Sequence, residues 1–546
     1  MSIPIVVGVT GHRFVREEDV PLLKETVRAE LQRLKNAYPN SEFIMLNSVA
    51  LGADTICAEA GISLGMRLVC PLPLEIEEYR KDFSGEDLST FENLIQKAEE
   101  VFVAPPTEPM PDPSAKEQMR DYAYRQAGIY IAAHSHVLLA LWDGKAGTAN
   151  GCGAAEAVGF MLDGNYKDGS TLLKSTNDGA VIHVLTPRKG TVPSGAIEAR
   201  LVEKESGSLN EILSMTDGFN RECKEVQTSG AYSLIPERYL KADRRLMRIQ
   251  NIYSKADAVA NGLQKRYLSA MKWFSAFGVL LVLAFLLYDE MESDLFLPIY
   301  GLIILLYLAL FLISKKHGVH MKFLQYRALA ESMRVQLYLC AAGIYENIGN
   351  AFTWTQKHES TWAKEAAGAV IVGAADAPAV PDEVLKAYWI DDQLAYHKKA
   401  LKRDSGKQRI NEKTARGMLA AAVVLFLLVF SLEFFAKDLM TQVVIAKFPK
   451  VFLVHAGQDF TLRSLLKIVL GVVSAVTMFL SNYYDKLSFD RKSVDHEKMI
   501  RLYQTAGEHY AQGENEQLFL ALAREEIIEN GNWVSYCREN APSFNL

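Results

Sequence analysis

The chain has 546 residues, too many for one ordinary hydrophobic core, so two or three domains are expected. Its net charge of −6 argues against a dedicated nucleic-acid binder, because such proteins usually carry a basic face. The six cysteines show no paired CxxC spacing, which favours a reducing compartment over a disulfide framework or a zinc site. We predict no metal and no cofactor, and no signal peptide, since no cationic stretch with an apolar core opens the chain.

The first 190 residues alternate short apolar runs with amphipathic stretches. Runs typical of strands are rich in Val, Ile and Leu and lie at residues 3–9, 42–46, 67–71, 100–103, 136–141 and 180–185. Helical patterns lie between them, at residues 20–35, 53–64, 115–133 and 153–162. This alternation predicts an α/β domain with right-handed βαβ units and a parallel, doubly wound sheet. Such a sheet binds ligands at the carboxyl ends of its strands, near a topological switch point.

The first predicted strand leads into a glycine-containing turn, formed by Gly8, Val9, Thr10, Gly11, His12 and Arg13. Backbone N–H groups in such a turn can approach an anion, and Thr10 adds a hydroxyl donor. Arg13 can pair with phosphate, and His12 can donate to phosphate or stack on a base. A tight turn with a surface arginine explains this motif equally well.

The second predicted strand also leads into a helix start. Ser48 and Gly52 would lie at the carboxyl end of this strand, facing a ligand, and Asp54 would lie in the first helical turn. Asp54 can hold a ribose hydroxyl or complement the helix dipole, and the second role is favoured.

A third loop, residues 140–156, carries four glycines between a strand and a helix, a composition that suits a phosphate-binding turn. Glu156 would lie one turn into that helix, where it could bind a ribose diol or assist catalysis. The candidate ligand-binding residues of this loop are Trp142, Asp143, Gly144, Gly151, Gly153 and Glu156. Three such loops at the ends of three strands predict a nucleotide site.

Three segments, GVTGHR, NSVALGADTICAEAGISLGMRLVCPLP and LLALWDGKAGTANGCGAAEAV, resemble SLOG domains, the Rossmann-like group that contains the LOG phosphoribohydrolases and DNA-processing proteins. LOG enzymes carry a PGGxGTxxE motif, and residues 150–156 keep its glycines and Glu156 but lack its proline and threonine. The resemblance therefore implies a sensor of a nucleotide second messenger, including messengers made from NAD. The alternative is a membrane-tethered LOG-like nucleotide hydrolase, with Glu156 as acid/base and Arg13 or Arg125 orienting phosphate or ribose.

Residues 191–265 have a polar, helical pattern that continues into the first of four long apolar runs, at residues 273–288, 295–313, 417–435 and 468–484. A spanning helix needs about 20 mostly apolar residues, so we predict four spans in two hairpins. Core helices of a large soluble protein are the alternative. The acidic loop at residues 289–294 lies between basic flanks, which places both ends of the first hairpin in the cytosol. An even number of spans returns the C-terminus to the side of the N-terminus.

Helical patterns follow each hairpin, at residues 320–342, 391–403, 485–510 and 514–530, with a small-residue loop predicted at residues 366–381. RALAESMRVQLYLCAAGIY and REEIIENGNWVSYCREN resemble SLATT-type modules, two-span regions regarded as pore-forming or membrane-disrupting effectors of antiviral defence. We predict four domains, at residues 1–190, 191–265, 266–410 and 411–546.

The two resemblances together imply a homo-oligomeric, multi-pass protein of the bacterial inner membrane. Its partners would be a nucleotide second messenger and the lipid bilayer, with no nucleic acid. It would permeabilise the membrane when the messenger binds. A nucleotide-regulated transporter is a weaker alternative, because the spans lack the intramembrane polar residues and helix breaks of transport sites.

Overall fold

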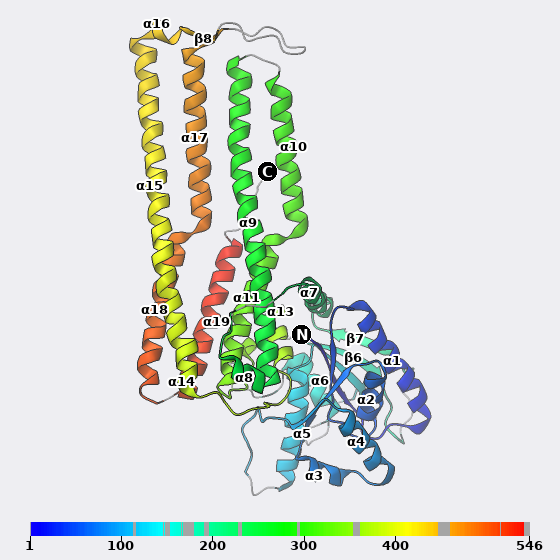
Figure 1. The fold of residues 1–546 in the computed structure, drawn as a ribbon. Coiled ribbons are helices and arrows are strands. Elements are labelled where there is room, and N and C mark those ends of the chain that lie inside the picture. The colour runs from blue at the N-terminus through cyan, green and yellow to red at the C-terminus, as the bar shows by residue number, and fades with distance from the viewer. Residues whose placement is uncertain are drawn as a thin grey trace. The chain divides into compact units, whose positions relative to one another are not determined.

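The computed structural model describes residues 2–112, 116–145, 147, 153–164, 166, 179–190, 196–227, 232–291, 295–352, 361–445, 459–513 and 515–539. Its contacts divide the chain into two compact units, each assembled from separate stretches (Figure 1). Unit 1 comprises Met1–Val259, Gln325–Leu385 and Glu514–Ser535. Unit 2 comprises Ala260–Leu324, Lys386–Gly513 and Tyr536–Leu546.

Unit 1 is built on a seven-stranded sheet with the order β4-β3-β2-β1-β5-β6-β7. The strands are β1 (Ile5–Gly11), β2 (Phe43–Leu46), β3 (Arg67–Leu72), β4 (Glu100–Val103), β5 (Val137–Trp142), β6 (Ala180–Leu185) and β7 (Ala199–Glu203). All neighbours pair in parallel except β7, which runs antiparallel to β6. The strand order reverses between β1 and β5, so the predicted switch point is present.

The sheet is buried on both faces, which is why its central strands read as continuous apolar runs. Ile5, Val7 and Val9 of β1 face a core completed by α1 (Val20–Ala37), α2 (Ala53–Ser63), α4 (Gly85–Lys97) and α7 (Ser208–Glu222). Val6 faces the opposite core, which α5 (Lys116–Ala133), α6 (Ala154–Asp163) and α13 (Thr361–Val370) complete. The α/β architecture predicted from the alternation of strands and helices is therefore confirmed.

Shorter and connecting helices complete unit 1. They are η1 (Glu17–Asp19), α3 (Ile76–Tyr79), η2 (Arg80–Asp82), α8 (Glu237–Ala242), η3 (Ile348–Ala351) and α14 (Asp382–Leu385). Helix α11 (Val319–Ala341) contributes most of its length to unit 1, as does α19 (Asn515–Glu539). Helix α13 is joined to α7 by a hydrogen bond of 3.0 Å from Trp362 Nε1 to Thr216 Oγ1. The segment that follows the first apolar hairpin thus forms part of the α/β unit.

Four helices are long and apolar enough to cross a membrane, by length and composition. They include the apolar parts of α9 (Arg244–Met291), α10 (Phe296–His317), α15 (Asp392–Phe435) and α17 (Leu462–Leu487). None of the apolar window is buried in the second and third candidates. Leucines and phenylalanines such as Leu305, 63% exposed, and Phe434, 68% exposed, therefore cover much of their surface. Such surfaces are stable in lipid and costly in water.

Unit 2 joins the two hairpins through close helix packing. A Cβ atom on Gly278 of α9 would lie 2.5 Å from Phe479 Cε1 of α17, and a Cβ on Gly471 would lie 2.5 Å from Leu286 Cδ1. Small residues at a helix contact allow such an approach. Lys467 Nζ adds an ion pair of 2.9 Å with Glu290. Helix α15 packs on α17 and on α18 (Phe489–Tyr510), and η4 (Lys386–Asp391), α16 (Lys437–Met440), β8 (Val443–Ile445) and β9 (Phe460–Thr461) complete the unit.

Two stretches differ from the sequence-based expectation. Residues 366–381 were predicted as a loop because they are small, but α13 extends into the first five of them, to Val370, and only residues 371–381 lie outside helices and strands. Alanine is the strongest helix former, and Ala366 and Ala367 are fully buried, so small size here reflects close packing. Strand β7 was not predicted, since its exposed, charged pattern lacks the apolar run of a central strand.

Candidate functional site

A crevice of about 350 Å³ opens at the carboxyl ends of β1, β2 and β3, beside the switch point. Parallel sheets usually bind ligands at this position. Seven of the predicted ligand-binding residues line this strand-end crevice: Thr10, Gly11, His12, Arg13, Ser48, Asp54 and Gly153. Arg125, which the alternative hydrolase hypothesis assigns to phosphate or ribose, lines it too. Gly8, Gly52, Trp142, Asp143, Gly144 and Glu156 are not among its lining residues, and Gly151 lies outside the described residues.

Two glycines allow the end of β1 to approach its neighbours. Gly52 has a φ of +78°, and its Cβ would lie 2.6 Å from the carbonyl oxygen of His12. That oxygen accepts a hydrogen bond of 3.1 Å from the N–H of Ala53, the first residue of α2. A Cβ on Gly11 would lie 2.7 Å from the carbonyl oxygen of Leu141 in β5. Gly11 and Gly52 therefore position the turn that carries His12 and Arg13.

His12 is held in one orientation by Asp143, which follows β5. The backbone N–H of Asp143 donates to His12 Nε2 at 3.0 Å, and the Asp143 carboxylate also pairs with Arg188 Nε at 3.1 Å. Burial lowers the pKa of His12, and the neighbouring Asp143 offsets this only in part. His12 Nε2 also lies 3.3 Å from Asp143 Oδ1, so Asp143 contacts this nitrogen with both its backbone N–H and its carboxylate. When Nε2 accepts from the backbone N–H, the neutral ring carries its proton on Nδ1.

The arginines of the crevice are tied to the surrounding fold. Arg13 donates to the carbonyl oxygen of Asp82 at 2.7 Å and remains largely exposed. Arg125 forms a two-point pair with Glu108, at 2.7 and 2.9 Å, and its guanidinium lies 4.7 Å from the centre of the Phe160 ring. Arg13 can therefore bind a phosphate more readily than Arg125, whose guanidinium already forms an ion pair with Glu108.

The loop after β2 contains a strained residue that the sequence did not reveal. Val49 has a φ of +50°, a conformation that is rare for a β-branched residue. Asn47 stabilises it, because its Oδ1 accepts from the N–H of Val49 at 2.7 Å and its Nδ2 donates to the carbonyl oxygen of Asp54 at 2.8 Å. Ser48 Oγ donates to the carbonyl oxygen of Pro71 at 2.8 Å. This strain fixes Ser48 at the edge of the crevice.

Asp54 and Glu156 both use their carboxylates within their own loops. Asp54 Oδ2 accepts from the N–H of Ala50 at 3.2 Å, and burial raises the pKa of Asp54 to about 7. Glu156 accepts from the N–H of Gly153 at 2.9 Å, the reciprocal half of a capping box at the start of α6. Both side chains are hydrogen-bonded within loops that border the crevice.

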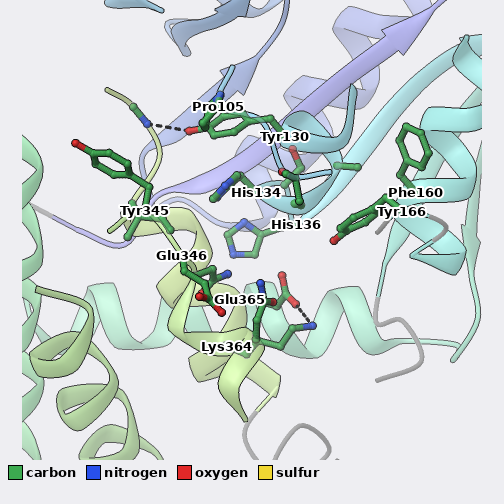
Figure 2. A pocket seen from close by; sticks show the side chains of 18 of the residues that line it. Pro105, Tyr130, His134, His136, Phe160, Tyr166, Tyr345, Glu346, Lys364 and Glu365 are labelled. Atoms are coloured by element: carbon green, nitrogen blue, oxygen red, sulfur yellow. Dashed lines mark hydrogen bonds and ion pairs between the residues drawn. The ribbon is translucent and has the colours of Figure 1, made fainter. Parts of the chain in front are cut away.

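Unit 1 holds a second and larger cavity, of about 650 Å³, which the sequence analysis did not anticipate. We name it the α5–α13 cavity, because it lies between the end of α5 and helix α13. Figure 2 shows its labelled side chains, Pro105, Tyr130, His134, His136, Phe160, Tyr166, Tyr345, Glu346, Lys364 and Glu365. These residues are distant in sequence, and no local motif connects residues 130–136 with residues 345–365.

Neither a protein-family model nor a curated protein matches the chain. Among the described residues, no group of three or more His, Cys, Asp or Glu side chains is placed to hold a metal ion.

Proposed function

We propose that the protein is a ligand-gated membrane effector of bacterial antiphage defence. A nucleotide-derived messenger, such as one made from NAD or ADP-ribose, binds the strand-end crevice of a Rossmann-like, SLOG-type domain. Binding causes oligomers of the SLATT-type hairpins to permeabilise the inner membrane, with both termini in the cytoplasm. The proposal is supported by the chemistry of the crevice and by the four apolar helices of the same chain.

The crevice presents groups that suit a phosphate or a ribose. The Thr10 hydroxyl, the His12 Nδ1–H and the first N–H groups of α6 donate, and Arg13 supplies a positive charge. Donors at a helix N-terminus combined with an arginine favour anionic groups. Its volume of about 350 Å³ lies within the range of small-molecule sites.

Helix α9 is the observation that carries the proposal. It runs without interruption for 48 residues, roughly 70 Å at 1.5 Å per residue. Its first part belongs to unit 1, where Arg244 pairs with Asp376 at 2.8 Å and Arg248 donates to the carbonyl oxygen of Val372 at 3.0 Å. Its last part contains the first apolar window. A continuous helix transmits a rotation or a shift from one end to the other.

The messenger can act only if it binds one arrangement of the protein more tightly than another. The capping role of Glu156 favours such a sensor over the alternative LOG-like hydrolase, because an acid/base would need that carboxylate to face the ligand. A sensor binds its ligand and releases it unchanged.

Thermal shift and product analysis on the full chain in detergent test this function. The probes are ATP, NAD, ADP-ribose and cyclic ADP-ribose isomers. We expect one of them to raise the unfolding temperature without being consumed, and Thr10→Val to reduce that shift by deleting a hydroxyl at constant volume. Thr90→Val is the matched control, since the Thr90 hydroxyl only donates to the carbonyl oxygen of Glu86 on the surface of α4. Turnover that is lost in Glu156→Gln would establish the hydrolase instead.

A further inference from the structure

The α5–α13 cavity contains a buried hydrogen-bond donor without an acceptor. His136 Nδ1 accepts from the N–H of Val6 at 3.0 Å, so the neutral ring carries its proton on Nε2. His136 Nε2 is buried and has no partner among the described residues. Buried donors are nearly always paired, because an unpaired one loses its hydration without compensation. Figure 2 shows the His136 ring beside His134, on the side of the cavity that carries Glu346 and Glu365.

His134 offers the complementary group. Its Nδ1 lies 3.0 Å from the carbonyl oxygen of Gly368, and a carbonyl only accepts, so this ring carries its proton on Nδ1 and has an acceptor at Nε2. Burial lowers the pKa of both histidines, which keeps both rings neutral. The cavity thus presents one imidazole donor and one imidazole acceptor, next to the carboxylate of Glu365.

Flat aromatic side chains form much of the wall. The Tyr130 ring lies 4.3 Å from the His134 ring and 5.4 Å from the Phe102 ring, measured between centroids. Phe160 and Tyr166 form a second edge-to-face pair, with centroids 6.1 Å apart. Aromatic surfaces of this kind stack on planar rings.

Two of the charges that line this cavity have partners within the protein. Lys364 Nζ pairs with Glu365 at 3.0 Å, and Glu346 pairs with Arg524 at 3.2 Å. Arg245 lies 3.7 Å from Asp243 and against the Tyr345 ring, but its buried Nε and Nη2 have no hydrogen-bond partner among the described residues. Arg245 therefore adds donors to the one that His136 supplies, and a ring with both donors and acceptors would find partners for both.

We propose that the α5–α13 cavity binds a planar nitrogen heterocycle of the nucleobase or nucleoside class. The His136 Nε2–H donates to a ring nitrogen or carbonyl of the ligand. Glu365 or His134 Nε2 accepts from an exocyclic amino group. A volume of about 650 Å³ accommodates a nucleoside. This site shares Phe160 with the strand-end crevice but has its own polar groups, so it does not depend on the function proposed above.

Nucleoside binding to the full chain in detergent, followed by calorimetry and by hydrogen–deuterium exchange, tests the site. Adenosine and inosine are a matched pair of probes, since inosine lacks the exocyclic amino group. We expect adenosine to bind more tightly than inosine and to protect residues 130–136 and 361–370 from exchange. Failure of both nucleosides to bind, or protection confined to residues 10–13 and 48–54, would overturn the proposal.

Two variants assign the contacts. His136→Asn keeps an acceptor for the N–H of Val6 but removes the Nε2 donor, so adenosine should bind about tenfold more weakly. His509→Asn is its control, because His509 is exposed on α18. Glu365→Gln should reduce the preference for adenosine over inosine. If His136→Asn does not fold, the preference measured for Glu365→Gln tests the assignment on its own. Unchanged adenosine affinity and preference in the folded variants would contradict the assignment.

Discussion

Gly52→Ala tests the close approach that builds the strand-end crevice. The new Cβ would lie 2.6 Å from the carbonyl oxygen of His12 and closer still to that of Arg13, and both atoms belong to the backbone. The turn that carries both residues must therefore shift. A positive φ costs an alanine about 1–2 kcal/mol, and a displaced, packed backbone costs about 1–3 kcal/mol. The sum of about 3 kcal/mol corresponds to a fall of roughly 4 °C in unfolding temperature, because the unfolding entropy of about 2.1 cal/mol/K per residue is large for a unit of this size.

The assay is thermal unfolding of the full chain in detergent, together with nucleotide binding. Gly190→Ala is the matched control, because Gly190 has a φ of +82° and no atom of the described residues within 4 Å of its Cβ position. The control should lose only the stability that an alanine at positive φ costs, about 1–2 kcal/mol, and it should still bind the nucleotide. Equal losses of stability in the two variants, or normal nucleotide binding by Gly52→Ala, would refute the reasoning.

Three further predictions concern single side chains. Because burial raises the pKa of Asp54 from 3.8 to about 7, the stability that this acid contributes is complete below about pH 4 and is lost as the pH rises through about 7. Asp54→Asn should therefore unfold at a higher temperature than the wild type at about pH 8 but not at about pH 4, and the same difference at both pH values would exclude this cause. Glu156→Ala should cost about 1 kcal/mol through loss of the N-terminal cap, whereas Glu156→Gln should cost less, as thermal unfolding would show. Gly278→Ile should clash with Phe479 and reduce the yield of monodisperse protein in detergent, whereas Gly301→Ile, with no atom of the described part of the chain within 4 Å of its Cβ position, should not.

Much of the α/β core could be predicted because its determinants are local. The apolar runs at residues 67–71 and 100–103 and the helix start at residue 53 are set by periodicity and by glycine. The position of the crevice followed from the rule for parallel sheets. The four helices that are long and apolar enough to span a membrane could be predicted, because length and apolarity can be read directly from the sequence.

The orientation of individual side chains could not be predicted. Glu156 and Asp54 occupy suitable positions in sequence, yet each carboxylate accepts from a backbone N–H of its own loop. The backbone groups that these carboxylates contact depend on the path of each loop, which the spacing of residues in the sequence does not determine. The α5–α13 cavity was missed for a related reason, because His136 and Glu365 are brought together by tertiary packing. Strained Val49 also gives no signal in the sequence, since valine is not a residue expected at positive φ.

Dye release from liposomes containing the full chain tests the central claim most directly. The nucleotide that raises the unfolding temperature should trigger release from liposomes with the wild type, and Thr10→Val should require a higher nucleotide concentration while reaching the same final release. Intact vesicles at saturating nucleotide, with binding confirmed in the same sample, would contradict the account.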